Sequence, residues 1–413
     1  MIRRLSIKGY KSLRDIELRE LSKLVLLYGP NASGKSNFLD ALDLLGFLAR
    51  EDTLSAAFQK HRGNRLGRPL PVRWFFSGAE EVLESPQRMI FSVDIELHNP
   101  IREGLNNELK AREETQSLQR PYTRVTRSVL RYELDVQYRH AERALEVMSE
   151  SLVPLNQRGE IRTGEVPYIR HESATRRASV KLERQAHPRY FNMPRQRTLL
   201  SEIGDPVNHP HLVAVARELA SIRVYYVEPT RMRGEVSDVR AEDPGPHGEA
   251  LASFYYWLKH NHDVRYKNLV HNLARFVPGL DSIDVKEGSE GFLELWIEEA
   301  KRGRFHAAMV SEGTLRLLCM LGIAAAPKPP AIVGYEEPEN GVNPARLAEI
   351  QRIFEEAASR AGGSQFFLTT HSAELLNLFD QTEDARLLRC EQGRDGSRYM
   401  TEEELPPISR GRS

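Results

Sequence analysis

Residues 29–36 read GPNASGKS and match the pattern G-x-x-x-x-G-K-[ST], which limits the possible folds of this chain more than any other feature. Residues 24–28 form an apolar run of strand length before the pattern, and residues 37–48 follow it with apolar side chains at helical spacing. In this context glycines let backbone N–H groups curl around phosphate oxygens, Lys35 offsets phosphate charge and Ser36 binds Mg²⁺. The pattern therefore predicts a strand, a phosphate-binding loop and a helix, with ATP and Mg²⁺ as ligands.

A pair of carboxylates follows a second apolar run at residues 331–335. A nucleotide site needs such a pair, since Glu336 can support the Mg²⁺ shell while Glu337 polarises the attacking water. Pro338 and Gly341 force the chain to turn away at once. An acidic loop by itself is usually only solvated, but its position after a strand in a chain with a phosphate loop favours a functional role.

Two weaker signals come from a histidine and from a helix start. His371 comes just after an apolar strand predicted over residues 365–369, where a side chain could sense the γ-phosphate. Ser311 and Gly313 begin a predicted buried helix over residues 313–326, and a helix N-terminus can bind an anion. Taken alone, a single histidine is more often structural, and a serine before a helix is commonly only its cap.

Four short phrases carry a family resemblance: YGPNASGKSN at 28–37, SEGTLR at 311–316, EEPENG at 336–341 and TTHS at 369–372. Their order resembles the ATP-binding-cassette ATPases, within the soluble SMC/RecF/OLD-like branch whose two cassette halves are separated by a long insertion. The phrases closely resemble the predicted-ATPase family common in bacterial anti-phage and toxin–antitoxin operons. The resemblance covers about residues 1–100 and 205–380.

The resemblance implies a role for each matching residue. The nucleotide would be held by Gly29, Asn31, Gly34, Lys35, Ser36 and Asn37. Ser36 and Glu336 would bind Mg²⁺. The catalytic residues would be Glu337 as the base, His371 as the switch histidine, and Lys35. Ser311 and Gly313 would contact the γ-phosphate bound to a second subunit, which implies a homodimer or a higher homo-oligomer.

The sequence departs from the family pattern at two positions. Glu336 stands where the family usually has Asp, which is one methylene shorter, so its contact with Mg²⁺ can be indirect. Asn343 stands where the family frequently has His. Both departures leave the rate of hydrolysis open. Gln59 is a guess for the glutamine that the class also uses.

The predicted fold is α/β: a P-loop ATPase head of the ABC type, with a mixed sheet flanked by helices. The chain divides into an N-terminal half of the head (1–100), an inserted basic subdomain (101–205) and a C-terminal half (206–413). Apolar and polar residues alternate at 89–97 and 128–137, which predicts antiparallel strands. Residues 50–73 are expected to form a loop because they are basic and rich in Gly and Pro. The insertion is expected to be α/β or helical.

Residues 170–197 form the most basic part of the insertion. Over the whole chain Lys+Arg and Asp+Glu are equal at 58 each, but in this stretch the acidic residues are only Glu172 and Glu183. The eight basic residues are Arg170, Arg176, Arg177, Lys181, Arg184, Arg189, Arg195 and Arg197. Any nucleic-acid surface must therefore be local. Three interpretations stay open for this stretch: a solvated insertion, a nucleic-acid contact, or a surface for a protein partner. Aromatic residues are sparse in it, so base stacking is not strongly indicated.

The rest of the composition indicates a cytoplasmic protein with no membrane contact. Only Cys319 and Cys390 occur, which favours a reducing compartment. The N-terminus has no apolar segment of a signal peptide, and no run approaches the ~20 apolar residues of a membrane-spanning helix.

Four functions compete for such a chain. The first is a dimeric ATP-driven switch or scaffold, the sensor of an anti-phage defence system that controls a separate nuclease or toxin. The alternative is a DNA-repair ATPase of the RecF/SMC type acting directly on DNA, although sustained heptads of an SMC arm are absent. A transporter subunit is disfavoured because Ser36 and Ser311 are 275 positions apart, and a self-contained OLD nuclease because only 42 residues follow His371.

Overall fold

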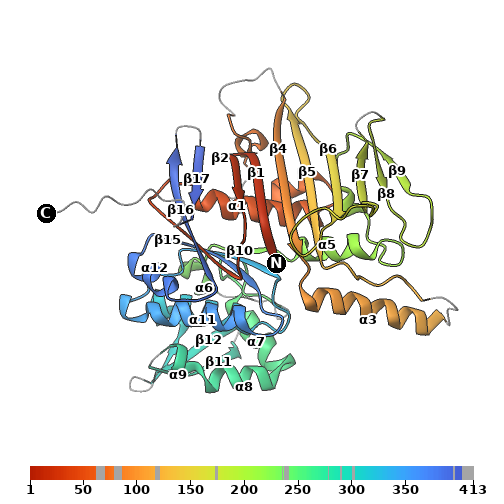
Figure 1. The fold of residues 1–413 in the computed structure, drawn as a ribbon. Helices are drawn as coiled ribbons and strands as arrows, with labels where there is room; N and C mark the ends of the chain where they lie inside the picture. The colour runs from red at the N-terminus through yellow and green to blue at the C-terminus, as the bar shows by residue number, and fades with distance from the viewer. Residues whose placement is uncertain are drawn as a thin grey trace. The chain divides into compact units, whose positions relative to one another are not determined.

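The computed structural model describes residues 1–61, 70–78, 86–116, 121–172, 175–234, 236, 241–277, 279–288, 291–299, 303–393 and 396–401 (Figure 1). The chain forms two compact units, one of residues 1–22, 30–222 and 389–413, and one of residues 23–29 and 223–388. The predicted boundaries near residues 100 and 205 both fall inside the first unit. Within the described ranges, no helix is long and apolar enough to cross a bilayer.

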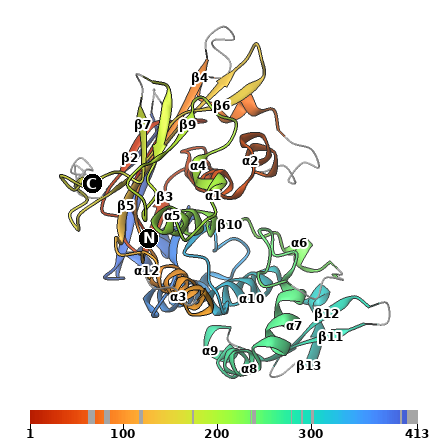
Figure 2. The same cartoon turned by 90° about the vertical axis from the view of Figure 1, so that its right-hand side faces the viewer.

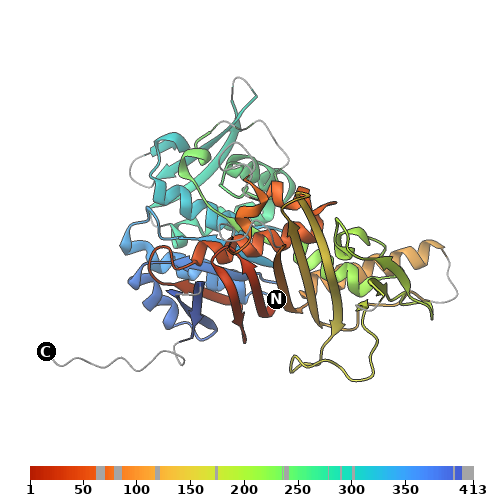
Figure 3. The ribbon, with the colours of Figure 1, turned by 90° about the horizontal axis from the view of Figure 1, so that it is seen from above.

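The first unit is built on an eight-stranded antiparallel sheet in the order β2-β1-β4-β5-β6-β7-β8-β9 (Figures 2 and 3). Its strands are β1 (Ile2–Tyr10), β2 (Leu13–Leu18), β4 (Gln87–Glu96), β5 (Val129–Arg139), β6 (Ala144–Pro154), β7 (Ile169–Glu172), β8 (Arg177–Val180) and β9 (Arg189–Asn192). The predicted antiparallel strands at 89–97 and 128–137 are confirmed as β4 and β5.

Alternation along these strands puts apolar side chains on one face of the sheet and polar side chains on the other. Leu5 and Ile7 of β1 and Phe91 and Val93 of β4 are buried on the apolar face, whereas Arg4, Ser6 and Lys8 of β1 alternate with them on the polar face. Helices of the same unit pack on the apolar side: α1 (Lys35–Arg50), α2 (Leu54–Lys60), α4 (Leu199–Glu202) and α5 (Pro210–Ala220), with α3 (Asn99–Gln116) packed on α5. The polar face carries many charged side chains, although some of its residues, such as Asp94 and Asp135, are buried.

The expectation of a loop over residues 50–73 is wrong in part. α2 lies inside that range because the Thr53 side chain caps it by accepting a hydrogen bond from the Ala56 amide. Leu54 and Phe58 give the helix a buried face, and a 3₁₀ turn, η1 (Val72–Phe75), ends the range. Residues 62–69 lie outside the described part of the chain. Gln59 is exposed on α2 rather than in a loop.

The second unit contains four parallel strands in the order β10-β14-β15-β3: β10 (Arg223–Tyr225), β14 (Ile332–Glu336), β15 (Gln365–Thr370) and β3 (Leu24–Tyr28). All four are short apolar runs, as expected for strands covered on both faces. α11 (Leu347–Ser359) packs on β3 and β15, and α10 (Glu312–Ala325) packs on α11. The strands predicted around 24–28, 331–335 and 365–369 and the helix predicted around 313–326 are confirmed.

The rest of the second unit extends this core. Its remaining helices are α6 (Pro229–Met232), α7 (Leu251–Asn261), α8 (Asp263–His271), α9 (Leu273–Phe276) and α12 (Ala373–Asp380). A three-stranded antiparallel sheet contains β11 (Leu280–Glu287), β12 (Leu293–Glu299) and β13 (Gly303–His306). β16 (Ala385–Gly393) runs from this unit into the first, where residues 389–393 pair with β17 (Gly396–Met400).

Candidate functional site

The predicted site residues of the second unit follow the carboxyl ends of three neighbouring parallel strands. Tyr28 at the end of β3 is the register partner of Thr370 at the end of β15, and Thr369 is the partner of Glu336 at the end of β14. Because the strands are parallel, the segments that follow them leave the sheet at one edge. Gly29, the pair Glu336–Glu337 and His371 therefore follow neighbouring strand ends at one edge of the sheet.

Glu337 is held in a left-handed backbone conformation with φ of 45°. Its amide donates to the carbonyl and to the Oγ1 of Thr369, both at 3.1 Å, and its Oε2 accepts from Asn340 Nδ2 at 2.6 Å. A residue other than glycine pays about 1–3 kcal/mol for such a backbone and keeps it only where the surroundings enforce it. The structure thus holds both the backbone and the carboxylate of Glu337 in one position at the strand end.

His371 lies against two carboxylates. Its Nδ1 is 3.4 Å from Oε1 of Glu337 and 3.6 Å from Oε1 of Glu339, and its side chain is 48% exposed. Glu339 is itself 7% exposed, and its Oε1 accepts from the Thr370 hydroxyl at 2.5 Å and from the His371 amide at 3.1 Å. The other oxygen of Glu339 is buried without a hydrogen-bond partner among the described residues.

Sequence reasoning missed Glu339. The phrase EEPENG contains three carboxylates, and a proline separates the third, Glu339, from the first two. The sequence does not indicate that the chain turns back at this point and places Glu339 beneath the strand ends. The structure makes Glu339 the residue that fixes the start of the segment carrying His371.

The phosphate loop continues in the first unit from Pro30 into α1. Gly34 adopts φ of 104° and precedes the first helical residue, Lys35. The Lys35 side chain is buried, and its Nζ donates to the Pro30 carbonyl at 2.9 Å, so the ammonium folds over the loop. Asn31 is exposed, whereas Ser36 is partly buried at the helix start. This is the strand–loop–helix arrangement that the motif predicts, with α1 presenting its N-terminal amides.

The last described strand of the chain holds the end of this loop. The Tyr399 hydroxyl donates to the Gly34 carbonyl at 2.9 Å, and Ser397 Oγ donates to Ser12 Oγ at 2.8 Å. Asn37 Nδ2 donates to the same Ser12 oxygen at 2.8 Å. A Cβ on Gly34 would stand 2.1 Å from Ser397 Oγ, so both its positive φ and its crowding require glycine. Burial raises the pKa of Tyr399 well above its ordinary value, which keeps its hydroxyl protonated.

Ser311 and Gly313 stand at the start of α10 in different environments. Ser311 is an exposed cap whose Oγ accepts from the Thr314 amide at 3.2 Å. Gly313 is buried, and a Cβ there would lie 2.6 Å from the Gly341 carbonyl. A glycine is therefore needed at 313 for the close approach of α10 to the loop that follows Glu337. The predicted contact of both residues with a nucleotide on a second subunit stays a prediction.

The basic stretch 170–197 divides into paired and unpaired side chains. Arg195 and Arg197 lie within 4 Å of Glu202, Lys181 stacks over Tyr168, and Arg184 stacks over Tyr122. The exposed side chains include Arg184 and also Arg189, which stacks over Phe191. Arg170, Arg176 and Arg177 are exposed as well, together with Tyr190. The strand register puts Arg170, Ser179 and Tyr190 in one row across β7, β8 and β9.

The protein side chains by themselves do not form a metal centre. In the described part of the chain, no group of three or more His, Cys, Asp or Glu could hold a metal ion. A Mg²⁺ ion at a nucleotide site usually takes one or two protein oxygens and the rest from phosphates and water. Ser36 and Glu336 stay the predicted Mg²⁺ ligands. The buried Ser33 Oγ lacks a partner among the described residues and adds a polar atom inside the loop.

This fold and this arrangement of motifs define a P-loop ATPase head of the ABC class, like that of SMC proteins. A crystal structure of an SMC head bound to the C-terminal winged-helix domain of ScpA aligns with a TM-score of 0.53 and 12% identity, covering 97% of this chain and 98% of the other. An SMC head with an extended coiled coil from Pyrococcus furiosus, bound to the C-terminal domain of ScpA, aligns with a TM-score of 0.50 and 11% identity, covering 97% and 96%. At such identities the likeness concerns the fold alone.

The chain belongs to the family described as "AAA domain, putative AbiEii toxin, Type IV TA system", whose profile matches residues 24–143 and 185–377. No curated protein matches the sequence. The family and the fold confirm the predicted resemblance to SMC/RecF-like ATPases of the ABC class, and they support nucleotide binding as the general activity of the chain.

Proposed function

We propose that this chain is an ATP-binding and ATP-hydrolysing switch that works as a dimer. The observation that carries the proposal is the convergence of Gly29, Glu337 and His371 at one edge of the parallel sheet. A phosphate loop begins there, a carboxylate is fixed there, and a histidine lies 3.4 Å from that carboxylate. These are the parts that hydrolysis of a γ-phosphate requires.

Each residue has a task that its contacts suit. The loop amides and Lys35 would bind the β- and γ-phosphates, while Ser36 and Glu336 would hold Mg²⁺, which offsets the charge that develops during phosphoryl transfer. Gly34 and Asn37 would hold the shape of the loop, and Asn31 would contact the nucleotide from its exposed position.

Glu337 would accept the proton of the water that attacks the γ-phosphorus, as the bond to the β-phosphate oxygen breaks and ADP leaves. Asn340 and Thr369 hold the carboxylate and its backbone in place, so little reorganisation is needed when water arrives. His371 would donate a hydrogen bond to the γ-phosphate. Because it also lies beside Glu337 and Glu339, its position would couple the bound phosphate to these two carboxylates.

The exposed position of Ser311 supports the proposed dimer. Its side chain is exposed at the N-terminus of α10, where free amides and the helix dipole favour an anion. A second copy of the chain would bring its bound γ-phosphate to this helix start, so that ATP holds two subunits together. ATP binding would then close the dimer and change the surface offered to a partner.

The biological role proposed is a cytoplasmic sensor of anti-phage defence that controls a separate nuclease or toxin. The family description, which names a Type IV toxin–antitoxin system, supports this role. The SMC heads that share the fold were solved with another protein, ScpA, which supports the idea of a separate protein partner here.

The second candidate is a DNA-maintenance ATPase, which the exposed side chains of Arg170, Arg176 and Arg177 favour, together with the exposed Tyr190 in the same row as Arg170. Changing these three arginines to Glu should remove salt-sensitive binding of DNA and leave basal ATPase activity unchanged. DNA binding that ignores both salt and these substitutions would exclude a role for the stretch in nucleic-acid contact.

The test of the proposed site compares two variants with a matched control in phosphate release and nucleotide binding. Lys35→Ala should abolish ATP binding, because the phosphate charge loses its partner. Glu337→Gln should bind ATP, lose turnover by at least a hundredfold and accumulate the ATP-bound dimer. The control is Glu383→Gln, which changes an exposed carboxylate of the second unit. Equal ATP affinity in wild type and Lys35→Ala, or full turnover in Glu337→Gln, would refute the assignment.

A further inference from the structure

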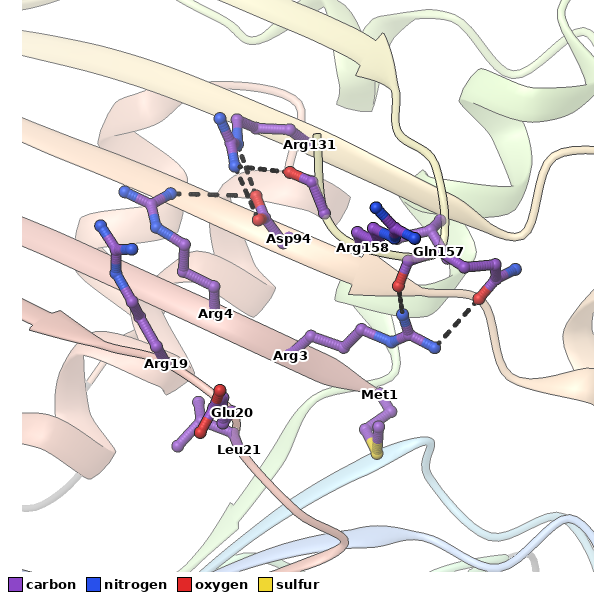
Figure 4. A pocket seen from close by; sticks show the side chains of 12 residues that line it. Met1, Arg3, Arg4, Arg19, Glu20, Leu21, Asp94, Arg131, Gln157 and Arg158 are labelled. Carbon is purple, nitrogen blue, oxygen red and sulfur yellow. Dashed lines mark hydrogen bonds and ion pairs between the residues drawn. The ribbon is translucent and has the colours of Figure 1, made fainter. Parts of the chain in front are cut away.

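A pocket of about 570 Å³ opens on the polar face of the eight-stranded sheet (Figure 4). It lies entirely in the first unit and contains five arginines, Arg3, Arg4, Arg19, Arg131 and Arg158, around the carboxylate of Asp94. Among the described residues of its lining, Glu20 has the only other carboxylate. The pocket is large enough for a ligand of nucleotide size, since ligand sites usually measure about 300–1,000 Å³.

Strand register explains why the arginines gather in a row. Asp94 on β4 is the partner of Arg4 on β1 and of Arg131 on β5. Arg19 directly follows Leu18, the last residue of the outer strand β2, whose partner is Leu5, so it continues the row just beyond the end of β2. From β2 to β5 the row spans four strands spaced about 4.8 Å apart, or about 14 Å.

Asp94 positions two of these guanidinium groups. Its side chain is 6% exposed, and it accepts from Arg131 through both oxygens, at 2.5 and 2.7 Å, while Arg4 Nη1 is 3.8 Å away. Figure 4 shows both guanidinium groups beside this carboxylate. A guanidinium has five N–H donors, so the pair with Asp94 fixes the orientation of Arg131 and leaves donors over. Such a fixed fork is suited to a planar or tetrahedral anion.

The charge of the pocket is paired at its floor and open at its rim. Glu17 pairs with Arg4 and Arg19, Glu96 pairs with Arg3, and the charge of Glu133 adds to that of Asp94 at Arg131. The exposed Arg158 has no ion-pair partner among the described residues, and the side chain of Arg19 is 72% exposed. The positive charge open to a ligand therefore lies at the rim, where a ligand would enter.

The pocket is separate from the predicted nucleotide site. β1 begins at the pocket and ends at Tyr10, beyond which Ser12 accepts the hydrogen bond from Asn37 of the phosphate loop. Six residues of strand, or about 20 Å, separate Arg4 from Tyr10. A ligand in the pocket thus occupies the far end of the β1–β2 hairpin from the contacts that hold the loop.

We propose that this pocket binds a ligand that presents two or more phosphate groups at once. A row of about 14 Å is longer than one phosphate can bridge, and an arginine fork binds phosphate oxygens through two parallel N–H···O bonds. None of the described residues that line the pocket is aromatic, so the pocket recognises phosphates and not a stacked base. Two sources share this chemistry: the backbone of a nucleic acid, and a free polyphosphate.

The experiment measures binding of two probes to the full chain carrying Lys35→Ala, which removes the phosphate loop as a competing site. The probes are inorganic tripolyphosphate by calorimetry and a fluorescent single-stranded 12-nucleotide DNA by anisotropy, each at several salt concentrations. The variant Arg19→Glu/Arg158→Glu changes only rim side chains. Its matched control, Lys110→Glu/Arg143→Glu, makes the same change in charge at exposed positions outside the pocket lining.

The rim variant is expected to weaken binding at least tenfold and to lower the salt dependence by about one counterion per lost arginine contact. The control is expected to stay within twofold of its parent. Tighter binding of the oligonucleotide would identify a nucleic-acid backbone, and tighter binding of tripolyphosphate a free polyphosphate. The proposal is overturned if neither probe binds, or if both double variants weaken binding equally.

Discussion

The hydroxyl of Tyr399 donates a 2.9 Å hydrogen bond to the carbonyl of Gly34, the residue that opens the helix after the phosphate loop. The two residues are 365 positions apart. The last described strand thus supports the loop that the sequence motif defines near the N-terminus. The loop is held in shape before any ligand arrives.

Removal of the Tyr399 hydroxyl should weaken nucleotide binding without unfolding the protein. Tyr399→Phe keeps the buried ring and loses one hydrogen bond, worth about 1 kcal/mol, so ATP affinity should fall about fivefold. Titration with a fluorescent ATP analogue measures the change. Tyr190→Phe, which alters an exposed tyrosine of the same unit, serves as the control and should bind like wild type. Unchanged affinity in Tyr399→Phe would mean that the loop keeps its shape without this bond.

Glu339 should affect turnover more than nucleotide affinity. Glu339→Gln keeps the shape of the side chain but removes the charge that receives hydrogen bonds from Thr370 and from the His371 amide. His371 then loses its fixed position, and we expect the ATPase kcat to fall about tenfold while the Kd for ATP changes less than twofold. Steady-state phosphate release and equilibrium binding separate the two quantities. A variant that loses affinity and turnover in parallel would indicate general damage to the strand ends.

A substitution of Ser311 that keeps the N-cap of α10 can test the proposed dimer. Ser311→Asp retains an oxygen that accepts from the Thr314 amide, so α10 should stay stable, but it places a negative charge where a second subunit would bring its phosphate. The variant should bind ATP normally, fail to dimerise with ATP and lose turnover. Mixing it with Lys35→Ala subunits should restore at most one working site per dimer, measured by phosphate release and light scattering. Normal turnover in Ser311→Asp would contradict the composite site.

Glu150 should make the stability of the first unit depend on pH. Burial raises the pKa of Glu150 to about 7, although the amides of Leu199 and Leu200 and the hydroxyl of Tyr132 donate to its carboxylate. The unfolded chain releases this proton near pH 4.5, so between pH 4.5 and about 7 the folded state binds more protons. The free energy of unfolding should therefore fall over this window as pH rises, by on the order of 3 kcal/mol, and stay low above it.

The measurement for Glu150 is the difference in unfolding free energy between wild type and Glu150→Gln, taken from urea melts at several pH values. The difference cancels the titration of all other groups. Wild type should lose stability relative to the variant from pH 4.5 to 7. A difference that is constant across this range would show that the carboxylate is already ionised in the folded protein.

The sequence predicted the elements that carry the motifs because their signals are local. The run 24–28, the glycines of the phosphate loop and the helix after it are confirmed as β3 and α1, and the strands before Glu336 and His371 as β14 and β15. Short apolar runs ended by glycine or proline define such strands in any soluble chain. The α2 helix was missed because the Gly- and Pro-rich composition of residues 50–73 masked a short capped helix within the range.

The sequence by itself determined the class of fold and the identity of the candidate catalytic groups, since these depend on residue type and on order along the chain. Only the tertiary structure decided which side chains support them. Glu339 lies beneath His371 because parallel pairing of β14 with β15 aligns their ends, and Tyr399 reaches Gly34 because β17 returns to the first unit. The row of arginines at Asp94 likewise exists only through the register of four strands. No local pattern encodes such contacts, because hydrogen bonds and ion pairs between distant segments depend on how the strands pair and not on spacing within any one of them.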